Sequence, residues 1–170
     1  MIAEPKGPEP YLSMTAIGRD SVPDGSPIRT LDRWWRQKRL STGLYPKRTD
    51  VDPIELGATL IPWLFIASVI RGETDMDYRF RLIGTANARL VGHDATGVLA
   101  SELFGSSDRT MIKTSFDETV KKGEPTFWRA AIPHKHHFPV PVFRALYPLA
   151  DDGKTVDHIV GTAIPENVVV

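Results

Sequence analysis

The 170-residue chain contains no cysteine. Disulfides, cysteine metal sites, thiolate nucleophiles and cysteinyl–flavin photochemistry are therefore excluded. The chain also has no excess of charge, because 21 Lys and Arg residues balance 21 Asp and Glu residues. This balance argues against a nucleic-acid partner held mainly by phosphate neutralisation.

Long apolar runs and a targeting segment are also missing. The longest strongly apolar run, 63–70, has about eight residues, whereas a membrane span needs about 20. The N-terminus (MIAEPKGPEPYLSM) is polar and proline-rich, and it lacks the positive-then-apolar order of a signal peptide. We therefore expect a cytoplasmic protein with no membrane partner. Residues 1–28 are expected to form a flexible proline-rich tail and residues 29–170 a single domain.

Apolar periodicity in the rest of the chain predicts an α+β fold. Helices are expected over 30–39, from 53 to about 60, in short pieces over 84–104, and over 109–122. Strands are expected over 63–70, 77–83, 126–132, 140–149 and 156–164. The strands form a five-stranded antiparallel sheet. The short helices and the long helix cover one face of it, and N-terminal helices precede it.

The helix over 30–39 has an apolar face made by Leu31, Trp34 and Trp35. Thr30 is a candidate N-cap, and Asp32 suits the positive end of the helix. The apolar face packs either on its own sheet or on a second subunit, and the sequence leaves both open.

The next helix has a clear start. Asp52 is expected as the N-cap, Pro53 as the first helical residue and Glu55 as the capping-box partner, with the helix running to about Leu60 before Pro62. The carboxylates of this helix are therefore interpreted as structural.

Four segments resemble a known family: 46–53 (PKRTDVDP), 60–65 (LIPWLF), 78–85 (YRFRLIGT) and 92–97 (GHDATG). Together with the element order they resemble the PAS_5 family of small stand-alone bacterial PAS-like proteins, over about residues 30–165. The resemblance implies a sensory or regulatory domain without catalysis of its own. It also implies a pocket between the sheet and its covering helices, and pairing of subunits through N-terminal helices and the outer sheet face.

The pocket candidates are apolar side chains on the strands and the long helix. They are Phe80, Leu82, Ile112, Phe116, Trp128, Phe143, Tyr147 and Ile164. The same set would also suit a filled apolar core. Arg81 or Arg129 would be more informative if it pointed inward, but alternation places Arg81 on the outer face, near Asp50 or Asp52.

The five histidines suggest chemistry only weakly. His134, His136 and His137 fall in one loop, but the last two are adjacent and point opposite ways on extended backbone, and the loop holds no carboxylate. We therefore expect no metal there and interpret the loop as solvated and basic. His93 and Asp94 form an adjacent pair, but no nucleophile motif accompanies them, so we expect a structural turn rather than a catalytic pair.

The sequence is compatible with more than one ligand and with more than one kind of partner. Haem-binding PAS domains generally carry a histidine on the long helix, and 108–122 has none, so haem is not expected; a non-covalent flavin or a small metabolite is still possible. Gly84 and Thr85 could bind an anion at backbone N–H groups, or simply cap a helix.

The leading hypothesis is a non-enzymatic sensor, working as a homodimer and signalling through a partner protein, because no output segment is recognised in the chain. A ligand-free interaction adaptor is the alternative, and a small histidine-dependent enzyme is the third hypothesis.

Overall fold

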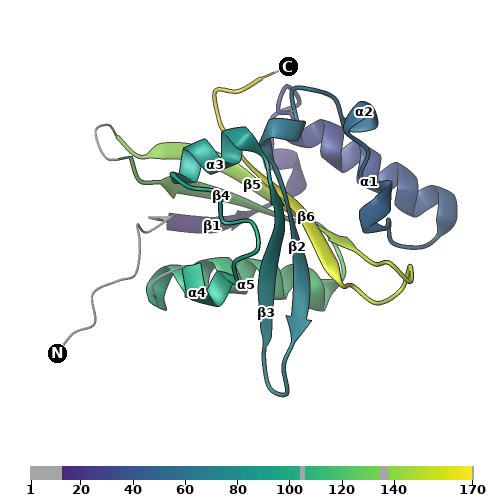
Figure 1. The fold of residues 1–170 in the computed structure, drawn as a ribbon. Helices are drawn as coiled ribbons and strands as arrows, with labels where there is room; N and C mark the ends of the chain where they lie inside the picture. The colour runs from purple at the N-terminus through teal and green to yellow at the C-terminus, as the bar shows by residue number, and fades with distance from the viewer. Residues whose placement is uncertain (1–12, 104–105, 135–137, 170) are drawn as a thin grey trace.

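The protein is a single antiparallel sheet with helices on both faces (Figure 1). A computed structural model describes residues 13–103, 106–134 and 138–169. The strands are β1 (Ser13–Ile17), β2 (Leu64–Arg71), β3 (Met76–Ile83), β4 (Thr126–Ile132), β5 (Val140–Leu149) and β6 (His158–Pro165). They lie in the order β1-β4-β5-β6-β2-β3, so the β2–β3 hairpin packs beside β6 at one end of the sheet.

The helices are α1 (Ile28–Thr42), α2 (Pro53–Leu56), α3 (Thr85–Val91), α4 (Ala100–Leu103) and α5 (Ser106–Lys122). Short 3₁₀ turns cover Arg19–Ser21, Arg48–Asp50 and Ile61–Trp63. The predicted α+β class and the strands and helices between β2 and β6 are confirmed. In the described part of the chain, no helix is long and apolar enough to cross a membrane.

Within the described residues the sheet has six strands, one more than predicted, because part of the expected tail forms β1. This strand pairs antiparallel with β4, with Met14 opposite Ala130 and Ala16 opposite Trp128. Residues 13–28 are therefore part of the folded domain, which corrects the expectation of a flexible tail there. Residues 1–12 lie outside the described residues.

Two apolar cores lie on opposite faces of the sheet. One, under α3, α4 and α5, contains Phe65, Tyr78, Phe80 and Phe116. The other, under α1, is built from the side chains of that helix together with the alternate residues of β5 and β6. Because β5 and β6 are central and covered on both faces, their sequences are apolar almost throughout.

Helix α1 begins earlier than predicted, with Pro27 as its N-cap, so Thr30 lies inside the helix. It ends at Gly43, whose φ of 69° is the left-handed conformation that glycine adopts without steric cost. Asp32 was expected at the positive end of the helix, but it is the fifth helical residue and is 1% exposed.

Helix α2 begins as predicted, since the Asp52 carboxylate accepts a hydrogen bond from Ile54 N at 2.8 Å. It ends at Leu56, one turn before the predicted end near Leu60. Glu55 accepts a hydrogen bond from the Trp34 indole at 3.1 Å, which ties α2 to α1 instead of closing a capping box.

The turn between β3 and α3 depends on a glycine. A Cβ atom on Gly84 would lie 2.3 Å from the carbonyl oxygen of Pro62, which is closer than atoms can approach. Gly84 N also donates to Leu64 O at 2.7 Å, so the chain crosses close over the start of β2 at this point. Gly84 therefore serves this close backbone approach. We assign no anion to it, because α3 has only seven residues.

Candidate functional site

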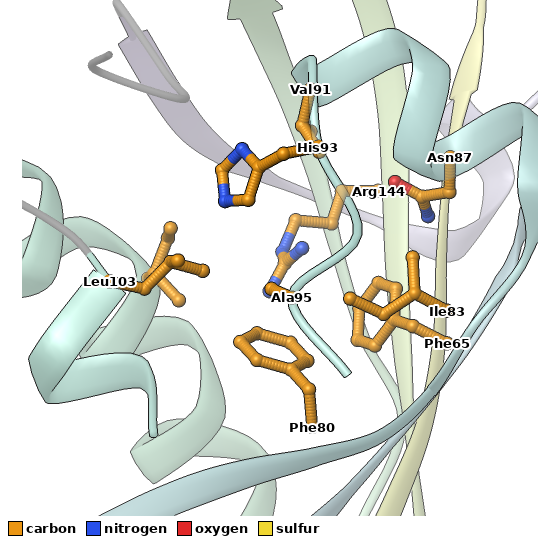
Figure 2. A pocket seen from close by; sticks show the side chains of 10 residues that line it. Phe65, Phe80, Ile83, Asn87, Val91, His93, Ala95, Leu103 and Arg144 are labelled. Carbon is orange, nitrogen blue, oxygen red and sulfur yellow. The ribbon is translucent and has the colours of Figure 1, made fainter. Parts of the chain in front are cut away.

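A partly open cavity of about 50 Å³ lies between the sheet and the layer formed by α3, α4 and α5. Figure 2 shows the side chains of its wall converging on one space. They are Phe65, Phe80, Ile83, Asn87, Val91, His93, Ala95, Leu103, Ile112 and Arg144.

The wall is assembled from distant parts of the chain. Phe65 comes from β2, Phe80 and Ile83 from β3, Ile112 from α5 and Arg144 from β5. The remaining side chains come from α3, from the segment that follows it and from α4. The cavity therefore exists only when the sheet and all three helices are in place.

A β-bulge decides which face of β3 lines the cavity. Ile66 pairs with Leu82, but the next residue of β2, Ala67, pairs with Phe80. Strand β3 thus has one extra residue, Arg81, at this point. A bulge of this kind resets the alternation of side chains along the strand that contains it.

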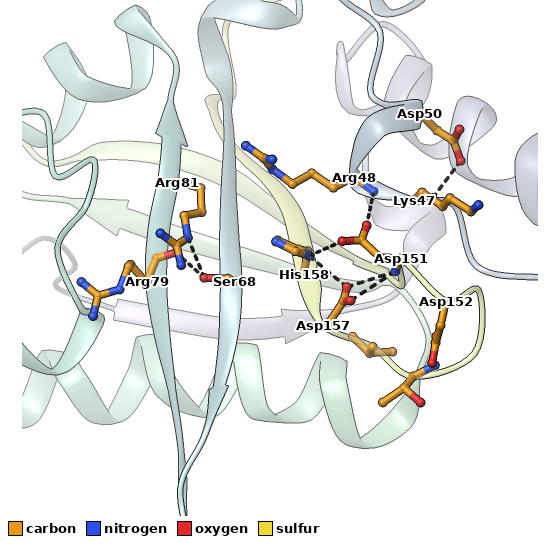
Figure 3. A network of polar contacts seen from close by, with 12 residues as sticks. Lys47, Arg48, Asp50, Ser68, Arg79, Arg81, Asp151, Asp152, Asp157 and His158 are labelled. Carbon is orange, nitrogen blue, oxygen red and sulfur yellow. Dashed lines mark hydrogen bonds and ion pairs between the residues drawn. The ribbon is translucent and has the colours of Figure 1, made fainter.

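The bulge explains why Leu82 is not in the pocket. Strict alternation placed Leu82 beside Phe80, but Leu82 is 44% exposed. Its neighbour Ile83 lines the cavity instead. Arg81 does not reach Asp50 or Asp52, because its guanidinium donates to the Ser68 hydroxyl at 2.9 Å (Figure 3).

Four other pocket candidates lie on the cavity side of the sheet. Ile112 lines the cavity, as does Phe80. Phe116 is fully buried in the same core and stacks on Tyr78, with ring centroids 4.6 Å apart. Trp128 is buried away from the cavity wall, where its indole donates to the Thr126 hydroxyl at 3.1 Å.

The last three candidates, Phe143, Tyr147 and Ile164, lie in the other core, under α1. They do not line the cavity, which corrects their assignment to the pocket. On β5 and β6 both alternating sets are apolar, so alternation alone could not say which set faced α5 and which faced α1.

The face of α1 that carries Leu31, Trp34 and Trp35 is buried in its own subunit. These side chains are 0%, 5% and 4% exposed, and the Trp35 indole donates to Pro148 O at 2.8 Å. Of the two alternatives for this helix face, the structure places it on its own sheet. Pairing of subunits through these side chains would require the core under α1 to open.

Arg144 is the charged residue of the cavity wall that sequence reasoning missed. It is 3% exposed, and its guanidinium carbon lies 5.1 Å from the centroid of the Phe65 ring and 5.2 Å from that of Phe116. Cations interact favourably with the faces of aromatic rings at such distances. A lone arginine between apolar neighbours in Val142–Leu149 was the signal that could have found it.

Comparison with known proteins gives the family. A family model for the PAS domain, PAS_5, matches residues 24–164. The chain belongs to this family. Its similarity to a solved structure, described as an RNA-binding light-oxygen-voltage receptor, has a TM-score of 0.46 and 13% identity. That alignment covers 93% of this chain and 40% of the receptor chain. Among curated proteins no match is found.

In this PAS domain, His93 and Asp94 do not form a relay. Asp94 accepts hydrogen bonds from the backbone and hydroxyl of Thr96, at 2.9 and 2.6 Å. These hydrogen bonds hold the pKa of the Asp94 carboxyl below its usual value, and the bond from the Thr96 hydroxyl has the larger effect. His93 is exposed at the edge of the cavity, and Asp94 is in the irregular segment between α3 and α4.

A second polar cluster lies where β5 turns into β6 (Figure 3). Ligand-type atoms of Asp151, Asp157 and His158 lie within 4.8 Å of one another. His158 Nδ1 lies 2.9 Å from the Asp157 carboxylate. The same carboxylate accepts a hydrogen bond from Asp151 N at 3.2 Å. These contacts hold the turn closed, and we assign no metal to them.

The histidine-rich loop lies between β4 and β5. His134 is exposed, whereas His136 and His137 lie outside the described residues. Arg129, the other arginine singled out from the sequence, is on the face opposite Trp128 and pairs with Glu166 at 2.5 Å near the surface.

The cavity does not fit a large cofactor. Its volume is about 50 Å³, whereas an engineered cavity that holds one benzene measures about 150 Å³. A flavin ring system is larger than benzene, and the chain has no cysteine to bond one.

Proposed function

We propose that this PAS domain is a non-enzymatic sensor that binds a small molecule in the cavity and reports its presence to a signalling partner protein. The cytoplasmic location predicted from the sequence is part of this proposal. The observation that supports it is a partly open cavity whose described lining residues are largely apolar and include one buried cationic side chain, Arg144. Binding sites for small molecules typically combine an apolar wall with a few placed polar groups.

The segment after α3 offers a physical route from the cavity to the surface. Ala95 lines the cavity and is 2% exposed, whereas Thr96 beside it is exposed. Gly97 N donates to Phe80 O at 2.6 Å, and Phe80 N donates to Val98 O at 3.1 Å. A ligand that displaces the Phe80 ring would therefore act on a strand edge bonded to this exposed segment.

The partner in this proposal reads the surface formed by residues 92–97. Ligand binding can shift the population of such a segment only by as much as the ligand's affinity differs between its conformations. A homodimer is also part of the proposal, formed through surfaces other than the buried face of α1. Sedimentation equilibrium of the full chain tests it, and a monomer throughout the micromolar range would contradict it.

The experiment that tests ligand binding is a fragment screen observed in ¹H–¹⁵N NMR spectra of the full chain. Neutral, cationic and anionic fragments are included, so the screen assumes no ligand class. We expect hits that shift the amide signals of Phe80, Ala95 and Ile112. Ala95→Leu should abolish these shifts by filling the cavity, whereas Ala58→Leu, which adds the same side chain at an exposed position, should not.

The small volume of the cavity favours one alternative function. At about 50 Å³ the space is also compatible with a filled core, in which case the domain is a ligand-free adaptor. The adaptor is favoured, and the sensor refuted, if no fragment shifts the amide signals of the cavity residues while the protein in the same preparation associates stably with a partner.

A further inference from the structure

Arg144 fixes a positive charge deep in the fold, at the wall of the cavity. It lies on β5, which is bonded to β4 on one side and to β6 on the other. Its backbone is therefore held by both neighbouring strands, opposite Trp128 and Ala163. Arginine keeps its proton under all conditions in which proteins are folded, so this charge is permanent.

The surroundings of the guanidinium hold it in one place. The rings of Phe65 and Phe116 lie within 5.2 Å of its central carbon and are themselves packed edge to face, with centroids 6.1 Å apart. Such ring contacts orient a planar cation without neutralising its charge. Figure 2 shows the guanidinium, Phe65 and Phe80 directed into the same space.

The rest of the cavity wall selects for negative charge. Among the described lining residues there is no Asp or Glu. Asn87 is one of the polar lining residues, and its side-chain amide N–H donates to Trp63 O at 2.9 Å. His93 stands at the exposed edge and can supply a further N–H donor. Because a low-dielectric wall strengthens electrostatic attraction, a cationic ligand is disfavoured here and an anionic one favoured.

The shape of the cation favours a carboxylate in particular. A guanidinium presents five N–H donors in a planar fork that matches the two oxygens of a carboxylate. Because a single hydrogen-bonded contact uses only some of these five N–H donors, Arg144 can bond to a neighbouring group of the protein and to an anion at the same time. Apolar side chains such as Ile112 and Leu103 supply a surface for a short hydrocarbon body beside it.

The size of the space sets the length of that body. The volume is about 50 Å³, one third of the roughly 150 Å³ that accommodate benzene. We propose that the cavity binds a short-chain monocarboxylate of about the size of acetate or propionate, with its carboxylate on Arg144 and its methyl end among the apolar side chains. This inference rests on the proposed function, since it names the ligand class of the same cavity.

The test is a titration of the full chain with sodium propionate, followed in ¹H–¹⁵N NMR spectra at constant ionic strength. Propionamide, which has nearly the same shape and no charge, and sodium nitrate, which has the charge and no hydrocarbon body, are titrated in parallel. We expect propionate to shift the amide signals of Phe80, Ala95 and Ile112, with at least tenfold weaker binding of the other two compounds.

Variants assign the effect to the guanidinium. Arg144→Met keeps most of the side-chain volume and should weaken propionate binding at least tenfold. Arg129→Met, a matched change of an exposed arginine on the adjacent strand, should leave it unchanged. If Arg144→Met does not fold, Arg144→Lys replaces it as the test, because lysine keeps the charge but lacks the planar set of N–H donors. Its affinity for propionate should be lower than that of wild type but higher than that of a variant without the charge.

Three outcomes overturn the inference and leave the sensor proposal standing. Equal binding of propionamide would show that charge does not select the ligand, and equal binding of nitrate would assign the site to small inorganic anions. If propionate binds nowhere in the cavity while the fragment screen yields other hits there, the carboxylate class is refuted alone. If the screen also yields none, both proposals fail.

Discussion

Replacement of Asp32 by alanine should destabilise the protein by about 3 kcal/mol. The buried carboxylate accepts hydrogen bonds from Arg19 Nε at 2.6 Å, Arg36 Nε at 3.0 Å and the Tyr147 hydroxyl at 3.2 Å. These contacts join α1 to the 3₁₀ turn before it and to the centre of the sheet.

The magnitude comes mainly from Tyr147. This side chain is fully buried, and an unsatisfied buried hydroxyl costs about 1–3 kcal/mol. The two arginine side chains are 44% and 43% exposed, so each can turn to water, and each ion pair contributes no more than about 1 kcal/mol. A gain of up to about 0.7 kcal/mol in helix propensity for alanine offsets part of the loss.

Urea denaturation of wild type and Asp32→Ala measures the effect. With a slope of about 2 kcal/mol per molar urea, the midpoint should fall by about 1.5 M. A double-mutant cycle with Tyr147→Phe isolates the buried hydroxyl, and it should give a coupling energy of at least about 1 kcal/mol.

Either of two results would refute this reasoning. A loss below about 1 kcal/mol for Asp32→Ala would mean that the carboxylate's own burial cost cancels its contacts. Strict additivity of the two changes would mean that the Tyr147 hydroxyl does not depend on Asp32.

Three further predictions follow from individual contacts. Gly84→Ala should lower the free energy of unfolding measured by urea denaturation by about 1–3 kcal/mol, because its Cβ would meet backbone atoms on the neighbouring turn. Gly18→Ala is the control, since a Cβ there would have nothing within 4 Å. Equal losses of stability in the two variants would contradict the clash. Trp35→Ala should cost about 3–5 kcal/mol and lower the melting temperature without changing the oligomeric state, since the side chain is buried in its own subunit; a folded variant that dissociates into monomers would instead assign it to an interface. Burial, and then the nearby charge of Asp32, raises the pKa of Tyr147 far above its ordinary value near 10, so above about pH 10 the unfolded chain loses a proton that the folded chain keeps. Stability should therefore fall by about 1.4 kcal/mol per pH unit for this group above pH 10, and Tyr147→Phe should lessen the slope of urea midpoints between pH 10 and 11; identical slopes would contradict it.

Local signals in the sequence were sufficient to predict the fold class and most of its elements. The β2–β3 hairpin, the last three strands and α5 follow from alternation, helical periodicity and turn residues, all of which are local signals. The N-cap at Asp52 was predicted for the same reason, because the cap and the backbone N–H it satisfies are two residues apart. Resemblance to the PAS family also depended on local segments, and the family match over residues 24–164 agrees with it.

Which side chains come into contact depends on packing between elements and could not be predicted locally. Strand β1 is short and polar on the outside, and only its pairing with β4 makes it a strand. The bulge at Arg81 exchanged Leu82 for Ile83 in the cavity wall, a one-residue shift that alternation cannot reveal. On β5, apolar side chains point to both faces, so the sequence could not tell that Arg144 faces the cavity while Phe143 faces α1. A sheet covered on both sides has no solvent-facing set of side chains, and its two faces are distinguished only once the helices have packed on them.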